Sequence, residues 1–381
     1  MTTHSGPRTA VLATTLAVVL CGWVAANLVA VSASASTVPL DARPNADCTG
    51  TSTGLVPLVD LGMGDYQGFP GGLYPDGLNA PPAGHHALAL EAAAEVRPLG
   101  ADGAPAAGGR VVLLSLGMSN ATQEFSAFVQ RARRDPSIRP DLTIVDGAQG
   151  GQTASVIRDP SANFWKVVDQ RLTAAGVTAA QVQTVWLKEA NAQPKAAFPV
   201  HARSLTDDMQ ADLRVAADRF PNLKLVYLSS RTYGGYASTA LNPEPYAYES
   251  GLAVRWLIER QIAGDAELNA DPARGAVRAP VLLWGPYLWA DGLTARGDGL
   301  TWRCEDFVDN GTHPSASGRA KVADMLMRFF QSDDTTRPWF AVDAAVPTTV
   351  TPAAGQTPTP TVTPTATVTP TVYRVYIPLA D

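Results

Sequence analysis

One serine of this 381-residue chain stands on a turn that would expose its hydroxyl group. Ser119 follows Gly117 and Met118, after the apolar run 111–116 and before an amphipathic stretch. A serine between a strand and a helix presents its Oγ, and its backbone N–H lies near the helix N-terminus, where developing negative charge is favoured. The position predicts a nucleophile with one oxyanion donor, although Ser119 or Asn120 could equally be the N-cap of the helix.

One histidine lies where it could take the proton of such a serine. The segment Asp-Phe-Val-Asp-Asn-Gly-Thr-His-Pro-Ser ends two residues after His313 and leads into a helical pattern. Beyond residue 35 the histidines are His85, His86, His201 and His313, and only His313 sits on a loop with acids nearby. This indicates a general base. Adjacent residues rarely share one metal site, so we expect a solvated loop at His85-His86 and no metal.

Two further loops could complete the site with hydrogen-bond donors. Gly150 and Gly151 follow an apolar run at 142–145, and glycines there let the backbone approach a ligand or simply make a tight turn. Asn191 follows the run 182–187, where its amide could donate to an oxyanion or bond to its own loop. The glycine spacing is not that of a dinucleotide fingerprint, so no cofactor is predicted.

The alternation of strands and helices accounts for these positions. Short β-branched or Leu-rich runs alternate with amphipathic stretches, which is typical of a parallel sheet covered on both faces. Such sheets bind ligands at the carboxyl ends of their strands. We predict an α/β fold: a three-layer α/β/α sandwich with a five-stranded parallel, flavodoxin-like sheet. The predicted strands are 111–116, 142–145, 182–187, 223–228 and 280–284, and the predicted helices are 87–96, 122–134, 163–174, 205–220, 248–262 and 315–330.

Taken together, these loops resemble the sequence blocks of the SGNH hydrolases, also called the GDSL esterase superfamily. In that family the first block contributes a Ser, the second a Gly, the third an Asn and the fifth an Asp-x-x-His. Ser119, Gly151, Asn191 and His313 occupy those places, and the resemblance covers residues 108–332. The Gly-x-Ser-Asn form of the first block looks more like the carbohydrate acetylesterase branch than like lipases.

The resemblance implies a mechanism through an acyl-enzyme. Ser119 would attack an ester carbonyl while His313 takes its proton and returns it to the leaving alcohol. The N–H groups of Ser119 and Gly151 and the amide of Asn191 would hold the oxyanion. Gly151 is preferred to the glycine before it because it lies five residues after an acidic position, where the family places Gly after Asn.

The acid of the expected triad is missing from its place. Where the family has Asp-x-x-His, this chain reads Asn310-Gly311-Thr312-His313. We favour Asp309, one residue away, as the partner of His313, in which case an Asn310→Asp variant would be no faster. Alternatives are Asp306 or a backbone carbonyl, which would leave a Ser–His dyad, and deamidation of Asn310 to an acid.

The two ends of the chain differ from its middle. Residues 1–35 run from a basic residue through an apolar stretch to Ala-Ser-Ala, the order of a cleavable secretory signal peptide, although an uncleaved anchor would look similar. We assign 36–107 to an N-terminal arm, 108–335 to the hydrolase domain and 336–372 to a Thr/Pro-rich spacer. Residues 373–381 form an alternating apolar segment, either a cell-surface attachment tag or a strand that folds back.

Export bears on the cysteines. After removal of the signal only Cys48 and Cys304 remain, and in an oxidising compartment we expect them to pair and to stabilise the fold by a few kcal/mol. Two separate buried thiols are the alternative. The net charge of −6 argues against nucleic acid as a partner.

The sequence therefore predicts a secreted or cell-surface serine esterase of monomeric form. Its substrate would be a small-molecule or carbohydrate ester with a small acyl group, such as acetyl. The rival hypothesis is a non-catalytic carbohydrate-binding or cell-surface module that keeps the fold but has lost the acid. Transfer of the acyl group to an alcohol instead of water would use the same residues.

Overall fold

A parallel sheet of five strands forms the centre of the computed structural model, which describes residues 46–342. The strands are β3 (Val111–Gly117), β4 (Leu142–Asp146), β5 (Val182–Lys188), β6 (Leu225–Leu228) and β7 (Val281–Trp284), in the order β4-β3-β5-β6-β7. All neighbouring pairs are parallel. β3, the first of these strands in the sequence, therefore lies between β4 and β5, which is the flavodoxin-like order. The predicted fold is confirmed.

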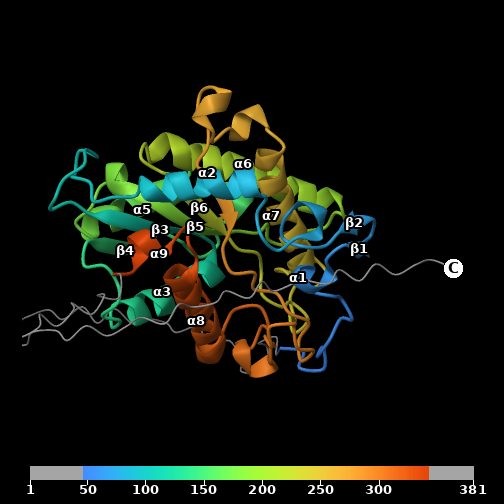
Figure 1. Ribbon diagram of the computed structural model, residues 1–381. Helices are drawn as coiled ribbons and strands as arrows, with labels where there is room; N and C mark the ends of the chain where they lie inside the picture. The colour runs from blue at the N-terminus through green and yellow to red at the C-terminus, as the bar shows by residue number, and fades with distance from the viewer. Residues whose placement is uncertain (1–45, 343–381) are drawn as a thin grey trace, which may run out of the picture. The chain divides into compact units, whose positions relative to one another are not determined.

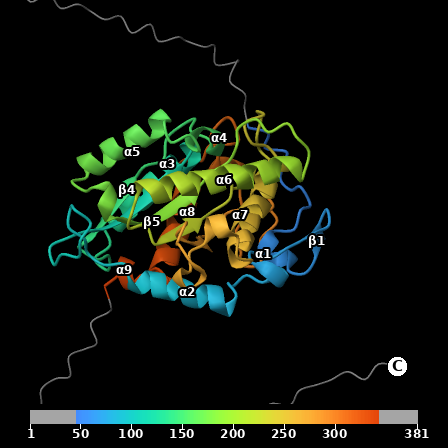
Figure 2. The ribbon, with the colours of Figure 1, turned by 90° about the horizontal axis from the view of Figure 1, so that it is seen from above.

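Helices cover both faces of this sheet (Figures 1 and 2). α3 (Ser119–Ala132) and α8 (Ala316–Ser332) pack together on one face. α5 (Asn163–Ala174), α6 (Val200–Arg219) and α7 (Tyr246–Ile262) lie on the other. α3 begins three residues earlier than predicted, at the serine itself, because Met118 in extended conformation is its N-cap.

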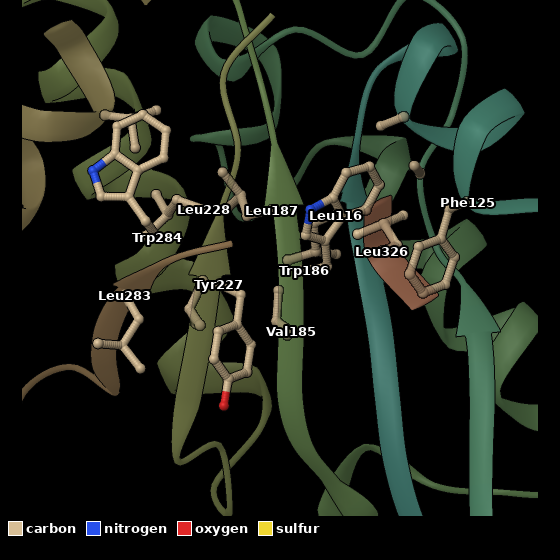
Figure 3. Packing of buried hydrophobic residues seen from close by; sticks show 14 of the residues in the cluster. Leu116, Phe125, Val185, Trp186, Leu187, Tyr227, Leu228, Leu283, Trp284 and Leu326 are labelled. Atoms are coloured by element: carbon tan, nitrogen blue, oxygen red, sulfur yellow. The ribbon is translucent and has the colours of Figure 1, made fainter. Parts of the chain in front are cut away.

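The core lies between the sheet and these two layers. Strands β3, β5, β6 and β7 are buried along their whole length, which explains their continuous apolar runs. Figure 3 shows Trp186 of β5 and Phe125 of α3 in this core, with ring centroids 5.4 Å apart in a stacked arrangement. These contacts fix α3, and with it Ser119, against the centre of the sheet.

The segment before β3 wraps the β6–β7 side of the sheet. It contains α1 (Leu58–Leu61), the two-stranded ladder of β1 (Asp65–Tyr66) and β2 (Phe69–Pro70), and α2 (Ala83–Ala94), which packs against β6 and β7. Short helices that were not predicted are α1, α4 (Ala154–Ile157) and α9 (Arg337–Phe340). Further 3₁₀ turns lie at Pro75–Gly77, Ala179–Gln181, Ala266–Leu268, Pro272–Arg274 and Cys304–Asp306.

The end of the folded domain requires one correction. Residues 336–342 were assigned to the spacer, yet Trp339 and Phe340 of α9 are buried in the core. Phe340 also accepts a backbone hydrogen bond from Arg139, ahead of β4. The two aromatic side chains supply the apolar area that holds this segment in place. The predicted signal peptide, the Thr/Pro-rich stretch from 343 onward and the segment 373–381 lie outside the described residues.

Candidate active site

Ser119 and His313 meet at the carboxyl end of the sheet although 194 residues separate them. The Oγ of Ser119 lies 2.8 Å from Nε2 of His313. Ser119 is the first residue of α3 and follows β3 through Gly117, which has φ +151°. A Cβ at Gly117 would lie 2.4 Å from the carbonyl oxygen of Lys188 on β5, so only glycine lets the two strand ends come this close.

The loop that carries His313 is attached to α3 on one side and to α8 on the other. Asn120, next to the serine, donates from Nδ2 to the carbonyl oxygen of Thr312 at 2.8 Å. Val308 N–H donates to the carbonyl of His313, closing the loop at its base. Ser315 caps α8. Through Asn120 the chain fixes the histidine relative to the helix that begins at the serine.

Asn310 is the side chain that contacts the second nitrogen of His313. Its Nδ2 lies 2.7 Å from Nδ1 of the ring. Its Oδ1 accepts the backbone N–H groups of Thr312 at 3.0 Å and His313 at 2.9 Å. Because two backbone donors face Oδ1, the amide cannot be turned round without placing donor against donor. Asn310 therefore presents its NH₂ group to the ring.

This arrangement corrects the prediction that Asp309 is the partner of His313. Asp309 is exposed and makes no hydrogen bond to the ring within residues 46–342. Asp306 is buried, but its Oδ2 is taken by Lys321 and by the N–H of Arg303. The turn places the side chain of Asn310 against the ring of His313, at the position that the Asp-x-x-His spacing implies. The side chain of Asp309 is left in solvent.

The Asn310 contact fixes the form of the imidazole. Since the NH₂ group donates, Nδ1 must accept, and a neutral ring then carries its proton on Nε2, facing Ser119. Burial, and secondly the positive charge of Arg231, lower the pKa of His313, so the neutral ring prevails at neutral pH. A base that accepts the serine proton at Nε2 needs the opposite tautomer. The site can bring serine and imidazole together, but Asn310 opposes the form that activates the serine.

The backbone donors expected around the oxyanion lie in two turns. Ser119 is the first residue of α3, so its N–H has no acceptor within the helix. Of the two candidate glycines, Gly150 is the closer to the serine. A Cβ built on Gly150 lies 3.9 Å from Cβ of Ser119, whereas one built on Gly151 has nothing within 4 Å. The preference for Gly151 over Gly150 therefore has no support from this proximity, and a role for Gly151 remains a prediction.

Asn191 is held by partners that the sequence did not indicate. Its Nδ2 donates to Oδ2 of Asp208 on α6 at 2.6 Å, and its Oδ1 accepts the N–H of Ser155 at 3.0 Å. Asp208 is buried and also pairs with Arg158. Two partners of opposite kind fix which end of the amide is which. One N–H of Asn191 is used in this way, and the second makes no hydrogen bond to another residue within 46–342.

A buried ion pair supports the strand ends beneath these residues. Lys188, the last residue of β5, contacts Glu124 of α3, and both side chains are almost fully buried. Burial lowers the pKa of Lys188 to about 8 against the opposing attraction of Glu124, and burial raises the pKa of Glu124. The pair joins the helix of the serine to the strand that precedes Asn191. The sequence did not indicate this contact, because Lys188 and Glu124 are 64 residues apart.

The predicted disulfide is present. Cys48 and Cys304 are bonded, with Cα atoms 5.4 Å apart, across 256 residues of sequence. Cys304 opens the 3₁₀ turn Cys304–Asp306 at the start of the histidine loop. The bond thus ties the segment before α1 to the loop that carries His313.

Two features are absent from the part of the chain that the structure describes, a cluster of metal-ligating side chains and a membrane-spanning helix. Residues 46–342 contain no cluster of three or more His, Cys, Asp or Glu side chains able to hold a metal ion. His85 is buried in α2 with Nε2 on the carbonyl of Leu282, which corrects the expected solvated loop. No helix in this range is long and apolar enough to cross a bilayer.

Comparisons with known proteins give distant likenesses only. No family model matches the chain, and no curated protein matches it. Solved structures that resemble it include a proposed acylhydrolase from Bacteroides fragilis, at 12% identity and a TM-score of 0.34, over 63% of this chain and 92% of that one. The periplasmic domain of a lipopolysaccharide acetyltransferase from Salmonella ser. Paratyphi A has 13% identity and a TM-score of 0.33, over 58% of this chain and 83% of that one. A protein from Arabidopsis thaliana has 11% identity and a TM-score of 0.29, over 55% and 67%. At these scores the likenesses do not identify an activity for this chain.

Proposed function

We propose that this chain is an exported serine enzyme that cleaves small acyl esters, such as acetyl esters of carbohydrates, through an acyl-enzyme. The observation that carries the proposal is the contact of 2.8 Å between Oγ of Ser119 and Nε2 of His313 at the carboxyl end of the sheet. Asn191, with one N–H left to donate, supports a role in holding the oxyanion. The disulfide agrees with an oxidising compartment.

The reaction would proceed in two steps, acylation of Ser119 and then deacylation. A lone pair of Ser119 Oγ forms a bond to the ester carbonyl carbon, the carbonyl π pair moves to oxygen, and the serine proton passes to Nε2 of His313. Collapse of the tetrahedral intermediate breaks the bond to the alcohol oxygen, which leaves with that proton. Water, or an acceptor alcohol in the transferase variant, repeats the sequence and restores the serine. The first proton transfer needs an Nε2 without hydrogen, so Asn310 makes the enzyme slow.

The rival function is a non-catalytic binding module on the same fold. One specific observation favours it, namely that an amide and not a carboxylate faces Nδ1 of His313. Such a module would bind its ligand at the same strand ends without converting it to a product.

Hydrolysis of a chromogenic acetate ester separates the two functions. We expect wild type to be measurably faster than a Ser119→Ala variant, because the alanine has no nucleophile. Ser332→Ala, which changes an exposed serine at the end of α8, is the matched control and should keep the wild-type rate. Equal rates for wild type and Ser119→Ala would refute the enzyme and leave the binding module.

A further inference from the structure

The two edges of the central sheet are covered to different degrees. β7, at one edge, is buried along its whole length, and α2 packs against it. β4, at the other edge, is partly exposed at four of its five residues (Figure 1). An edge strand that nothing covers presents backbone N–H and C=O groups with which a further strand can pair. The edge formed by β4 is therefore the one open to another strand.

The hydrogen bonds between β4 and β3 show which backbone groups face outward. The N–H of Gly147, directly after β4, donates to the carbonyl oxygen of Ser115 on β3. In a parallel pair alternate residues of a strand bond to the same neighbour, so the odd-numbered residues of β4 pair with β3. Leu142, Ile144 and Asp146 then face the other way. At the centre of the strand, both the N–H and the C=O of the partly exposed Ile144 point away from the sheet.

A groove lies along this edge. Two cavities of about 380 and 400 Å³ follow one another along β4, the first beside its start and the second beside its end. They share four lining residues, namely Val129, Arg133, Ile144 and Ala175. Val129 lies on α3 and Ala175 follows α5, and these helices cover opposite faces of the sheet. At the far end Arg171 donates to the carbonyl oxygen of Asp146 at 2.8 Å and closes the groove. The space is thus continuous with the plane of the sheet.

The described chain ends beside this groove. Val342, its last residue, donates its N–H to the carbonyl oxygen of Ser137 at 2.7 Å, and Ala341 forms an antiparallel bridge with Ile138. Ile138 itself lines the cavity at the start of β4.

The sequence beyond this point has the length to return to the groove. Residues 343–372 separate Val342 from the alternating apolar segment 373–381. As a flexible coil these 30 residues would span about 30 Å, and as polyproline II about three times as much. A strand of the length of β4 is only about 17 Å long. The segment can therefore reach every part of the groove, in either direction.

We propose that residues 373–381 pair with β4 as a sixth strand of the sheet. The segment begins with Tyr-Arg-Val-Tyr-Ile, which contains no proline and consists mostly of β-branched and aromatic residues, the types enriched in strands. The Thr/Pro-rich stretch before it is too rich in proline to supply a strand. Of the two interpretations of 373–381, this is the strand that folds back onto the domain.

Pro378 fixes which residues of the segment face β4. Proline has no N–H, so it is tolerated in an edge strand only where its nitrogen points away from the neighbouring strand. The residues next to it, such as Val375 and Ile377 at odd positions, must then form the hydrogen bonds to Leu142, Ile144 and Asp146. The outward proline would also prevent a seventh strand from adding.

Hydrogen–deuterium exchange of the intact chain, followed by NMR, tests this pairing. We expect the amides of Ile144, Val375 and Ile377 to be protected in wild type. In the double variant Val375→Asp/Ile377→Asp the two carboxylates cannot be buried between α3 and α5, and exchange of Ile144 and of the segment should become at least tenfold faster. The matched control Val350→Asp/Val362→Asp places the same charges in the Thr/Pro-rich stretch and should leave the rates unchanged.

A second variant blocks the groove and leaves the segment intact. Ala175→Trp fills the groove from an exposed position and should also speed exchange of Val375 and Ile377 at least tenfold. Ala273→Trp, at an exposed alanine that lines neither cavity, is its control and should keep the wild-type rates. Fast exchange of the segment in wild type, or slow exchange that persists in Val375→Asp/Ile377→Asp, overturns the proposal. Slow exchange found only in a dimer, identified by light scattering at the same concentration, also overturns it and assigns the segment to the groove of a second copy.

Discussion

Asn310 donates its side-chain amide to Nδ1 of His313, at the place where a serine hydrolase has an acidic acceptor. The backbone N–H groups of Thr312 and His313 hold Oδ1 of Asn310 and so fix the orientation of the amide. The ring keeps its proton on the side of the serine. Ser119 and His313 are already in contact, so the chemical consequence of the Asn310 contact can be tested by changing a single side chain.

If the proposed function is right, replacing the amide by a carboxylate should raise the rate of ester hydrolysis. In Asn310→Asp the carboxylate would accept Nδ1–H, free Nε2 to take the serine proton and stabilise the imidazolium. Loss of that acid in a serine protease costs about 10⁴ in turnover, which sets the upper limit of the gain expected here. The measurement is kcat/KM for a chromogenic acetate ester. A gain of several hundredfold or more is expected.

The neighbouring acid provides the control for this variant. Asp309→Asn removes an exposed carboxylate that does not contact the ring and should leave the rate unchanged. If Asp309→Asn instead lost most of the activity while Asn310→Asp gained nothing, Asp309 would be the true partner in solution.

The pH dependence should move with the same substitution. Burial, and secondly the charge of Arg231, lower the pKa of His313, so the wild-type rate should fall at a lower pH than the pKa of an ordinary histidine would give. A carboxylate at position 310 favours the charged ring and raises that pKa. The acid limb of the kcat/KM profile should therefore shift to higher pH in Asn310→Asp. A limb at the same pH in both proteins would show that His313 is not the titrating base.

The sequence allowed the sheet and the approximate site to be predicted for a physical reason. Continuous apolar runs define buried parallel strands, and in such a sheet the residues after each strand meet at one edge. Ser119 and Asn191 were found from this, and His313 was found as the histidine on a loop with acids nearby, before the last long helix. The helix starts were less certain, because α3 begins at a serine and α6 at Val200, where the hydrophobic period had not yet begun.

Contacts between distant side chains could not be read from the sequence. Whether Asp309 or Asn310 faces His313 depends on the turn of one short loop, and the spacing of the family was the better guide. Asp208 lies in the middle of a helix, where an acid is ordinarily exposed, so nothing marked it as a partner of Asn191. Gly150 and Gly151 differ by one residue in a turn, and sequence distance does not decide which of them approaches the serine.

Asp208 should act as a positioning residue for Asn191. It holds one N–H of the amide at 2.6 Å, so Asp208→Ala would let the amide rotate away from the oxyanion. We expect kcat to fall with little change in KM, by less than the 10²–10³ that loss of an oxyanion donor typically costs, and that full loss is expected for Asn191→Ala. The control is Asp207→Ala, an exposed neighbour on α6 that pairs with Arg260. Equal effects of Asp207→Ala and Asp208→Ala would remove the positioning role.

The ion pair of Lys188 with Glu124 should matter for stability more than for chemistry. Lys188→Met leaves the carboxylate of Glu124 buried without its partner, and breaking a buried pair in this way costs about 3–5 kcal/mol. The double variant Lys188→Met/Glu124→Leu removes both charges and is expected to recover most of that loss, because apolar side chains of similar size pack where the ions were. Urea denaturation of the two variants and of wild type measures the difference. If the double variant were as unstable as the single one, the pair would be needed for its specific geometry between α3 and β5 and not for charge compensation.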